Sequence, residues 1–170
     1  MSRVRKRRRG TAIVETEEGI LVTAGRGGVF ILPGGGANKD ESRTEAAMRE
    51  LREETGLHPH HAKYLFRHVG KVNKSHGHGY FQDHHTVCLV KATGTARPHH
   101  EVKHVAYYKH GSGVRISGTT REIIERYYAY KKHGRIGQKR ITIVNRMLEW
   151  LTGTGRHTSQ GVTDDYQFYD

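Results

Sequence analysis

Short apolar runs alternate with polar turns over the first part of the chain. Residues 11–16 and 19–23 are rich in β-branched side chains and flank the polar pair Glu17-Glu18, which predicts a β-hairpin. Residues 29–32 predict another strand, and Pro33 with the glycines after it predicts the end of regular structure. Further strands are predicted at Tyr64 to Val72, His85 to Lys91 and Val102 to Tyr108.

Residues 40–55 and 119–132 place apolar side chains at helical spacing. Asp40 or Ser42 is suited to cap the first helix, and Gly56 is suited to end it in a left-handed conformation. The order is strands, helix, strands, helix. It predicts an α/β (α+β) fold with a mixed sheet and helices packed on its faces.

Beyond residue 133 the pattern weakens, so residues 134–170 are predicted to be a C-terminal extension. Residues 141–151 carry apolar side chains at helical spacing and predict a third helix. Residues 152–170 are polar and predict a mobile tail. The helices at 119–132 and 141–151 are candidates for a homodimer contact or for covering the sheet, and the pattern does not choose between them.

The composition is 34% hydrophobic with a mean hydropathy of -0.77, which is typical of a water-soluble domain. No apolar run has the length of a membrane span, and no apolar segment follows the basic N-terminus as in a secretory signal. Cys88 is the only cysteine, which excludes an internal disulfide. We therefore expect a cytoplasmic protein that does not associate with membranes.

The net charge of +12 favours anionic partners such as nucleotides, inositol phosphates or nucleic acid. Residues 2–9 form a basic arm, which is either a solvated tail or strand start or an electrostatic guide for such a partner. Most of the 14 histidines fall in loops without nearby cysteines. A weakly basic loop therefore explains them better than zinc does, although His78 is a candidate for contacting substrate phosphate.

The most informative feature is a group of carboxylates in the first predicted helix. Glu50, Glu53 and Glu54 lie at i, i+3 and i+4, so they share one helix face. Such like charges repel each other, whereas Mg²⁺ seeks several oxygen ligands. Taken alone, the run also fits a surface helix with ordinary Glu-Arg pairs. The preceding glycines at 34–36 favour a ligand site, because they allow close approach to a phosphate or a metal.

These residues resemble the Nudix box, G-x5-E-x7-R-E-U-x-E-E-x-G-U, in which U is aliphatic. The pattern begins at Gly35, reaches Glu41 and continues from Arg49 to Leu57 with every fixed position filled. The resemblance implies a three-layer α/β/α sandwich with a mixed sheet over about residues 8–133. It also implies hydrolysis of a diphosphate linkage in a nucleotide-like substrate, with Mg²⁺ as cofactor and Mn²⁺ as an alternative.

The resemblance also implies roles for individual residues. Metal ligands would be the carboxylates of Glu50, Glu53 and Glu54, with the carbonyl of Gly35. Arg49 would orient a catalytic glutamate, while Glu41 and Gly56 would support the loop and the helix. A further glutamate often comes from a loop after the box, and Glu101 is the candidate by position. Either Glu53 or Glu101 would take a proton from the attacking water.

The sequence patterns that distinguish Nudix subfamilies do not identify the substrate. The ADP-ribose, NADH, coenzyme A and dinucleoside-polyphosphate patterns are not matched, which leaves a MutT-like nucleoside triphosphatase, with diphosphoinositols and capped RNA as further options. Phe66 and Tyr80 are candidates for stacking on a base, although aromatic side chains in strands are more often core residues.

Two other classes compete with a hydrolase of free nucleotides. The first is a non-catalytic Nudix-fold sensor that binds a nucleotide or nucleic acid, which the complete set of metal-binding positions argues against. The second is an RNA-processing Nudix enzyme that holds RNA through the basic arm. RNA affinity that falls steeply with salt would favour the second class.

Overall fold

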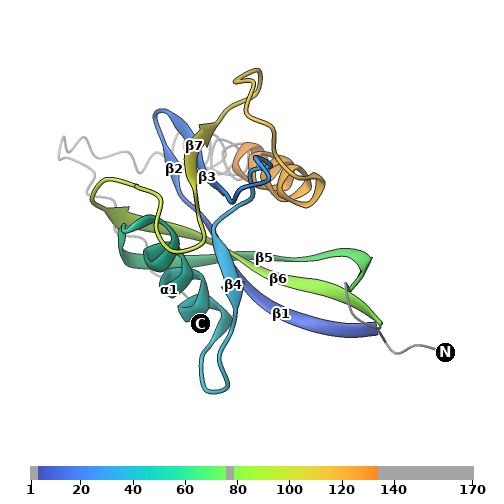
Figure 1. Ribbon diagram of the computed structural model, residues 1–170. Coiled ribbons are helices and arrows are strands. Elements are labelled where there is room, and N and C mark those ends of the chain that lie inside the picture. Colours follow the sequence, from blue (N-terminus) through green and yellow to red (C-terminus); the bar gives the residue numbers. More distant parts are fainter. Residues whose placement is uncertain (1–3, 76–78, 134–170) are drawn as a thin grey trace, which may run out of the picture. The chain divides into compact units, whose positions relative to one another are not determined.

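A computed structural model describes residues 4–75 and 79–133 (Figure 1). The elements printed in the figure are β1 (Val4–Ile13), β2 (Glu15–Thr16), β3 (Gly19–Ala24), β4 (Gly34–Gly36), α1 (Arg43–Thr55), β5 (His58–Lys74), β6 (Tyr80–Thr93) and β7 (His104–Tyr108). A second helix covers residues 118–133. Met1–Tyr128 form one compact unit, and the chain from Ala129 onward forms another.

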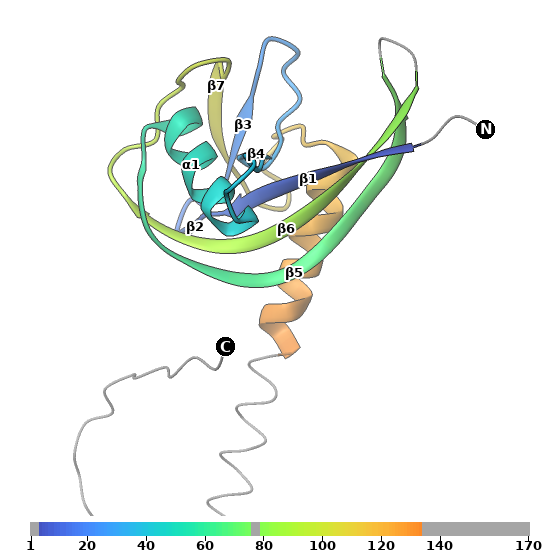
Figure 2. The ribbon, with the colours of Figure 1, turned by 90° about the horizontal axis from the view of Figure 1, so that it is seen from below.

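The strands form two sheets. The first has the order β4-β1-β6-β5, in which β1 and β6 run parallel and the other pairs are antiparallel. The second has the order β2-β3-β7 and is antiparallel. Figure 2 shows β1, β6 and β5 as a long curved ribbon that extends past α1. The mixed sheet is confirmed.

Neighbouring residues on the central strands face opposite helices, because side chains alternate along a strand. Ala12 and Cys88 pack in one cluster with Leu51 of α1. Ile13, which follows Ala12, and Val87, which precedes Cys88, pack in another cluster. Its other members include Ile123, Ile124 and Tyr127 of the second helix. The strands therefore lie between two helical layers, and the predicted α/β/α arrangement is confirmed.

Helix α1 has strong signals at both ends. The Ser42 hydroxyl accepts a hydrogen bond from the Glu45 amide, and the Glu45 carboxylate accepts one from the Ser42 amide, a capping box that satisfies two backbone donors. Gly56 has φ 70° and ends the helix, as predicted. The predicted start at residue 40 was too early, because Ser42 takes the capping position and the residues before it form a loop.

The glycine-rich segment differs from the prediction. Residues 29–32 form no strand and pair only through single bridges, whereas Gly34–Gly36 form β4 against β1. Gly34 has φ 152°, and a Cβ there would overlap the carbonyl oxygen of Gly10. The glycines therefore continue regular structure because they lack the atoms that would keep the two backbones apart.

The strands β5 and β6 are longer than the apolar pattern indicates, and the basic arm is the first half of β1. Val4–Ile13 pair continuously with Tyr80–Leu89. Backbone hydrogen bonds between strands form whatever the side-chain polarity, so a charged run can join a sheet when a partner strand is available. From Val4 onward the arm is thus the start of a strand, and its role as an electrostatic guide stays a prediction.

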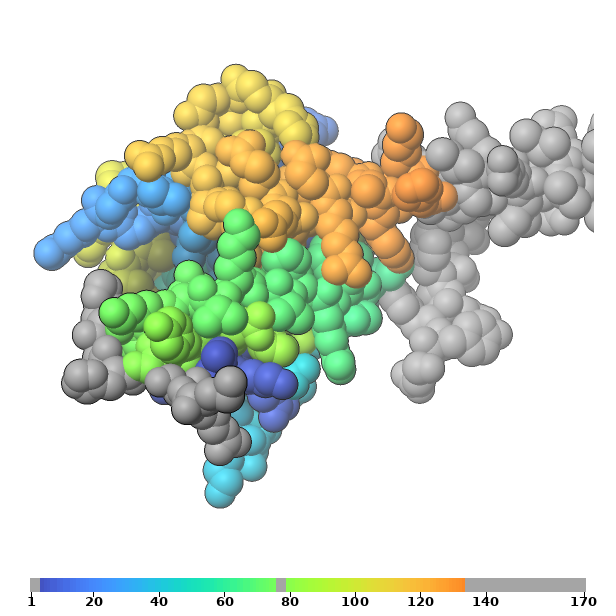
Figure 3. Space-filling view, turned by 90° about the vertical axis from the view of Figure 1, so that its right-hand side faces the viewer, coloured from blue at the N-terminus to red at the C-terminus, as the bar shows by residue number. Residues whose placement is uncertain are grey.

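Residues 118–128 of the second helix lie beside β5, in orange and green in Figure 3, and the two core clusters place them on the sheet face opposite α1. There the Arg126 guanidinium donates a hydrogen bond to the Arg67 carbonyl and stacks 4.3 Å from the centre of the Phe66 ring. Within the described residues, none of the helices is long and apolar enough to cross a bilayer. The third helix predicted at 141–151, and the tail, lie outside the described residues.

Candidate active site

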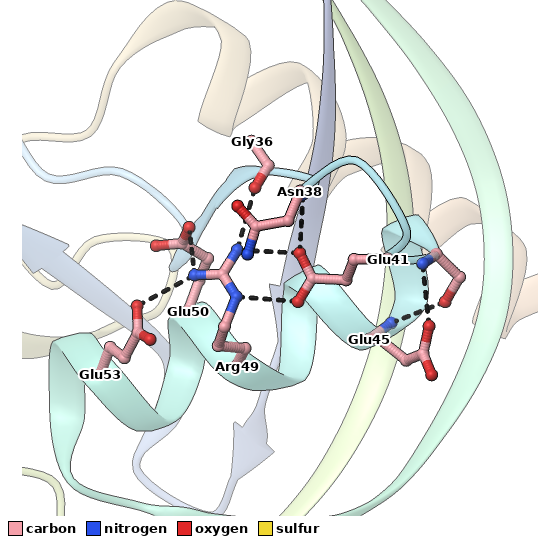
Figure 4. A network of polar contacts seen from close by, with 8 residues as sticks. Gly36, Asn38, Glu41, Glu45, Arg49, Glu50 and Glu53 are labelled. Carbon is pink, nitrogen blue, oxygen red and sulfur yellow. Dashed lines mark hydrogen bonds and ion pairs between the residues drawn. The ribbon is translucent and has the colours of Figure 1, made fainter.

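Arg49 lies at the centre of a network of polar contacts on α1 (Figure 4). Its guanidinium bonds both oxygens of Glu41, at 2.8 and 3.1 Å. It also donates to Glu50 at 2.8 Å, to Glu53 at 3.0 Å and to the Gly36 carbonyl at 2.9 Å. The hydrogen bonds with Glu41 are the largest cause that raises the pKa of Arg49 above its usual value. One planar donor therefore fixes several acidic side chains relative to the glycine strand.

Glu41 connects the loop before α1 to this network. Besides its bonds with Arg49, its carboxylate accepts a 2.9 Å hydrogen bond from the Asn38 amide. The Arg49 hydrogen bonds, and then the Asn38 bond, lower the pKa of Glu41. A carboxylate held in its charged form in this way ties the loop to the helix, which is the position expected for a supporting residue.

Glu54 is the buried carboxyl of the group, with 7% of its surface exposed. Burial, followed by the charges of Glu50 and Glu101, raises its pKa to about 7. The Thr23 hydroxyl, 3.4 Å away, and the Gly34 amide donate hydrogen bonds that partly oppose this shift. The carboxyl groups are therefore close enough to repel each other in a region with little water.

Glu50 and Glu54 border a cavity of about 360 Å³, whereas Glu53 is not part of its lining. Its lining combines the carboxylates with the glycine strand and one cation: Arg9, Thr23, Gly25, Ile31, Gly34, Gly35, Gly36, Glu50, Glu54, Glu101 and Val102. The cavity brings Glu101, from the loop before β7, to the carboxylates of α1. Glu101 therefore lies near the carboxylates of the box, as predicted, although its chemical role stays a prediction.

Gly35 must lack a side chain at this position. A Cβ built on its backbone would overlap the Glu50 carboxylate. The peptide of Gly35 is held in place by β4, where Gly35 is opposite Gly10 of β1. The Glu50 carboxylate can therefore approach the Gly35 backbone this closely only because residue 35 is glycine.

The donor chemistry of this site fits a hard divalent cation. Glu54 carries an unfavourable carboxylate charge that a cation would stabilise. As positioned, no three acidic or histidine side chains in residues 4–75 and 79–133 converge on a common point. Arg49 holds one oxygen each of Glu50 and Glu53, and the other oxygen of each is not bonded by it. Metal binding would therefore use these oxygens after a small rearrangement of side chains.

The aromatic candidates for substrate contact are not brought to this cavity. Phe66 is 6% exposed and packs in the core, covered by Arg126. Tyr80 lies opposite Val4, whereas Thr86 lies opposite Gly10 at the level of the glycine strand. Six residues of strand separate these levels by roughly 20 Å. His78 lies outside the described residues.

Two residues of the site were missed by the sequence analysis. Arg9 lines the cavity and donates a 2.9 Å hydrogen bond to the Gly34 carbonyl. Thr23 is 1% exposed and bonds Glu54. A buried threonine inside the apolar run at 19–24 is a signal that could have been used. Arg9 gave no such signal, because its neighbours in the arm are equally basic.

A second cavity of about 280 Å³ adjoins the first, because both are lined by Arg9, Ile31 and Gly34. Arg7 and Asp83 form a doubly hydrogen-bonded ion pair there, with both distances 2.7 Å. His85 accepts or donates a 2.9 Å hydrogen bond with Thr11. Burial lowers the pKa of His85 to about 4, so its ring is neutral at pH 7.

A comparison with protein families assigns residues 5–116, most of the described chain, to the NUDIX domain. The chain belongs to the Nudix hydrolase family. The membership agrees with the filled box, and it makes the protein an enzyme of the hydrolase class. No curated protein matches the sequence.

Solved structures, two of them named as Nudix hydrolases, resemble the fold. A putative Nudix hydrolase family member from Chromobacterium violaceum is 31% identical, covers 90% of this chain and 99% of its own, and has a TM-score of 0.65. The MutT Nudix hydrolase from Burkholderia pseudomallei is 21% identical, with 71% and 97% covered and a TM-score of 0.61. The E. coli ORF135 protein is 22% identical, with 75% and 92% covered and a TM-score of 0.59.

Proposed function

We propose that this Nudix hydrolase cleaves a diphosphate linkage in a nucleotide-like substrate, such as a nucleoside triphosphate, with Mg²⁺ or Mn²⁺ as cofactor. The observation that carries the proposal is the buried Glu54 carboxyl, whose pKa is raised to about 7 by burial and by Glu50 and Glu101. Carboxylates forced together beside a glycine backbone form a site whose charge is unfavourable until a cation binds.

The proposed metal ligands are Glu50, Glu53 and Glu54 with the Gly35 carbonyl. A bound divalent ion would neutralise charge on the diphosphate oxygens and lower the pKa of a bound water. Arg49 holds Glu53 by a 3.0 Å hydrogen bond, so it positions that carboxylate. Glu53 or Glu101 takes the proton from the attacking water.

The adjoining cavity offers a place for the remainder of the substrate. Arg9 lines both cavities, so its guanidinium is suited to an anionic group that spans them. The lining further along offers donors and acceptors, including Thr11, Asp83 and His85. Polar groups of both kinds suit the edge of a nucleobase or a sugar better than another phosphate.

The decisive experiment is release of phosphate or pyrophosphate from a substrate panel in the presence of Mg²⁺. The panel holds ordinary and oxidised nucleoside triphosphates, ADP-ribose, dinucleoside polyphosphates, diphosphoinositols and capped RNA. We expect one class to be turned over and Glu53→Gln to lose activity by about 10²–10⁴-fold, the usual contribution of a general base. Glu18→Gln, at the exposed hairpin turn, is the matched control and should keep full activity.

Three results would change or contradict the proposal. Full activity in folded, metal-binding Glu53→Gln protein would remove Glu53 from the reaction and leave Glu101→Gln as the variant to test. Binding without turnover across the panel would instead support the Nudix-fold sensor. Turnover of capped RNA alone, with affinity that falls steeply with salt, would identify an RNA-processing enzyme.

A further inference from the structure

A separate basic cavity of about 280 Å³ lies on the sheet face that carries α1. The described residues of its lining are cationic or neutral, and none is an aspartate or glutamate: Lys6, Arg8, Arg43, Arg67, His68, Val69, His84, His85 and Thr86. None of them lines the cavity that contains the Nudix carboxylates, although His85 also lines the adjoining cavity. The basic cavity and the carboxylate cavity therefore share no side chain.

Strand pairing and helix packing bring the cations together. Lys6 and Arg8 are two residues apart on β1, so their side chains leave the same face. Arg67 of β5 is opposite Thr86 of β6, and Arg8 of β1 is opposite His84, two residues before it. Figures 1 and 2 show these three strands continuing past the start of α1. The cavity lies along this uncovered part of the sheet.

Arg43 closes the cavity from the helix. It is the first residue of α1, and its carbonyl lies so close to β1 that a Cβ on Gly10 would overlap it. The helix start is thus fixed directly over the strand that carries Arg8. This contact explains why Arg43, Arg8 and Arg67 are close enough for their charges to interact.

The lysine and arginine charges of this cavity lack acidic partners within the part of the chain that the structure describes, whereas His68 pairs with Glu122 at 3.3 Å. Among the ion pairs of the described residues, none involves Lys6, Arg8, Arg43 or Arg67. The nearest acids along the chain are engaged elsewhere, Asp83 with Arg7 and Glu45 in the capping box with Ser42.

Arg43 itself has an unmet hydrogen-bond donor. Its Nε atom is buried and has no hydrogen-bond partner. Burial first, and then the charges of Arg8 and Arg67, lower its pKa. A buried donor without a partner is unfavourable, and more so when the group is charged. An anion in the cavity would supply both the acceptor and the opposite charge.

We propose that this basic cavity is a second anion site, distinct from the Nudix site, which binds a compact, multiply phosphorylated small molecule. Adjacent phosphates would face several cations at once, and guanidinium groups bind phosphate oxygens with two hydrogen bonds each. Among the residues that the structure describes, the cavity lining has no Phe, Tyr or Trp on which bases of a nucleic acid strand would stack. The basic residues of β1 are also divided between the two faces of the sheet, so they form no single track for a strand.

The test is calorimetric binding of inorganic tripolyphosphate to the full chain, with EDTA present so that the Nudix site holds no metal. We expect the double variant Arg8→Gln/Arg67→Gln to bind at least tenfold more weakly than the wild type. The matched control Lys63→Gln/Lys91→Gln removes the same charge from β5 and β6 outside the cavity and should bind like the wild type. Circular dichroism establishes that both proteins are folded, and Arg43→Gln provides a second, single-site variant with a similar expected loss.

Further arms separate this inference from the proposed hydrolase function. Glu53→Gln should bind tripolyphosphate as the wild type does, even if no substrate of the panel is turned over. Comparing tripolyphosphate with a nucleoside triphosphate shows whether the ligand is a free polyphosphate or the phosphate chain of a nucleotide. Equal weakening in both double variants, or no binding by the wild type, would overturn the proposal. An RNA 12-mer could bind the wild type more tightly than tripolyphosphate does and fail to bind the Arg8→Gln/Arg67→Gln variant. That result would overturn the assignment of a compact ligand.

Discussion

The two ends of α1 present the same physical problem with opposite signs. At its C-terminal half, carboxylates crowd around Arg49, which bonds Glu41, Glu50, Glu53 and a glycine carbonyl. At its N-terminus, Arg43 lies among other cations and its buried Nε has no partner. Concentrated like charge is costly in a folded protein unless a ligand of opposite sign is available. We therefore infer that one end of this helix serves a cation and the other an anion.

The largest effect is expected at the acidic end. In metal-free protein, the Glu54 carboxyl ionises near pH 7 when folded, against 4.5 for its ordinary value. The folded state retains the Glu54 proton to a higher pH than the unfolded state does. The free energy of unfolding therefore falls as pH rises from 4.5 to about 7 and stays low above pH 7. Glu54→Gln should remove this penalty and raise the free energy of unfolding at pH 8 by at most about 3 kcal/mol, with no gain near pH 4.

The measurement is denaturant unfolding of both proteins at the two pH values in EDTA. Adding Mg²⁺ should then stabilise the wild type more than the variant, because the ion binds the carboxylate that the variant lacks. Glu18→Gln serves as the control. An equal gain at pH 4 and pH 8 would show that the effect does not come from the Glu54 charge.

A backbone change should disturb both ends together. A Cβ at Gly10 would overlap the Arg43 carbonyl and crowd the Ala47 amide. Gly10→Ala should displace α1 from β1 and destabilise the protein by about 1–3 kcal/mol, as overpacking does. Tripolyphosphate affinity and hydrolysis should both fall. Gly27→Ala is the matched control, since nothing lies within 4 Å of a Cβ there. If only one activity falls, the two sites do not share this anchor.

The two arginines of α1 can be separated by a conservative change. Arg49→Lys keeps the charge but cannot bond Glu41, Glu50 and Glu53 together, because an ammonium lacks the planar fork. Losing a hydrogen bond to a charged group costs about 1.5–3 kcal/mol, so kcat should fall by roughly 10- to 100-fold. Tripolyphosphate binding in EDTA should be unchanged. A parallel loss of anion binding would argue against two independent sites.

The smallest effect is expected for Arg43→Gln without ligand. Removing an unpaired cation from among Arg8 and Arg67 should stabilise the protein by about 0.5 kcal/mol or less. The gain should shrink as salt rises, because salt screens the repulsion. Thermal unfolding at low and high salt measures it. A marked destabilisation at both would mean that Arg43 is held by packing rather than opposed by charge.

Local chemistry explains which features of the fold could be predicted from the sequence. The left-handed Gly56 and the hairpin at Glu17-Glu18 depend on neighbouring residues, and each was predicted. Ser42, which caps the helix, was one of the two residues predicted for that position. The pairing of Gly34–Gly36 with β1 was not, because it requires a strand that is distant in sequence. For the same reason, the apolar pattern underestimated β5 and β6.

The family and the helix that carries the carboxylates could be predicted from the sequence, because the box is a contiguous pattern whose spacing aligns Glu50, Glu53 and Glu54 on one helix face. The groups that meet this face depend on contacts that form when the chain folds. Folding brings Glu101, Thr23 and Arg9 to the cavity beside Glu50 and Glu54, keeps Phe66 in the core and gathers Arg8, Arg43 and Arg67 around one basic cavity. Burial and the field of neighbouring charges depend on contacts between distant segments, so they arise only when the chain folds.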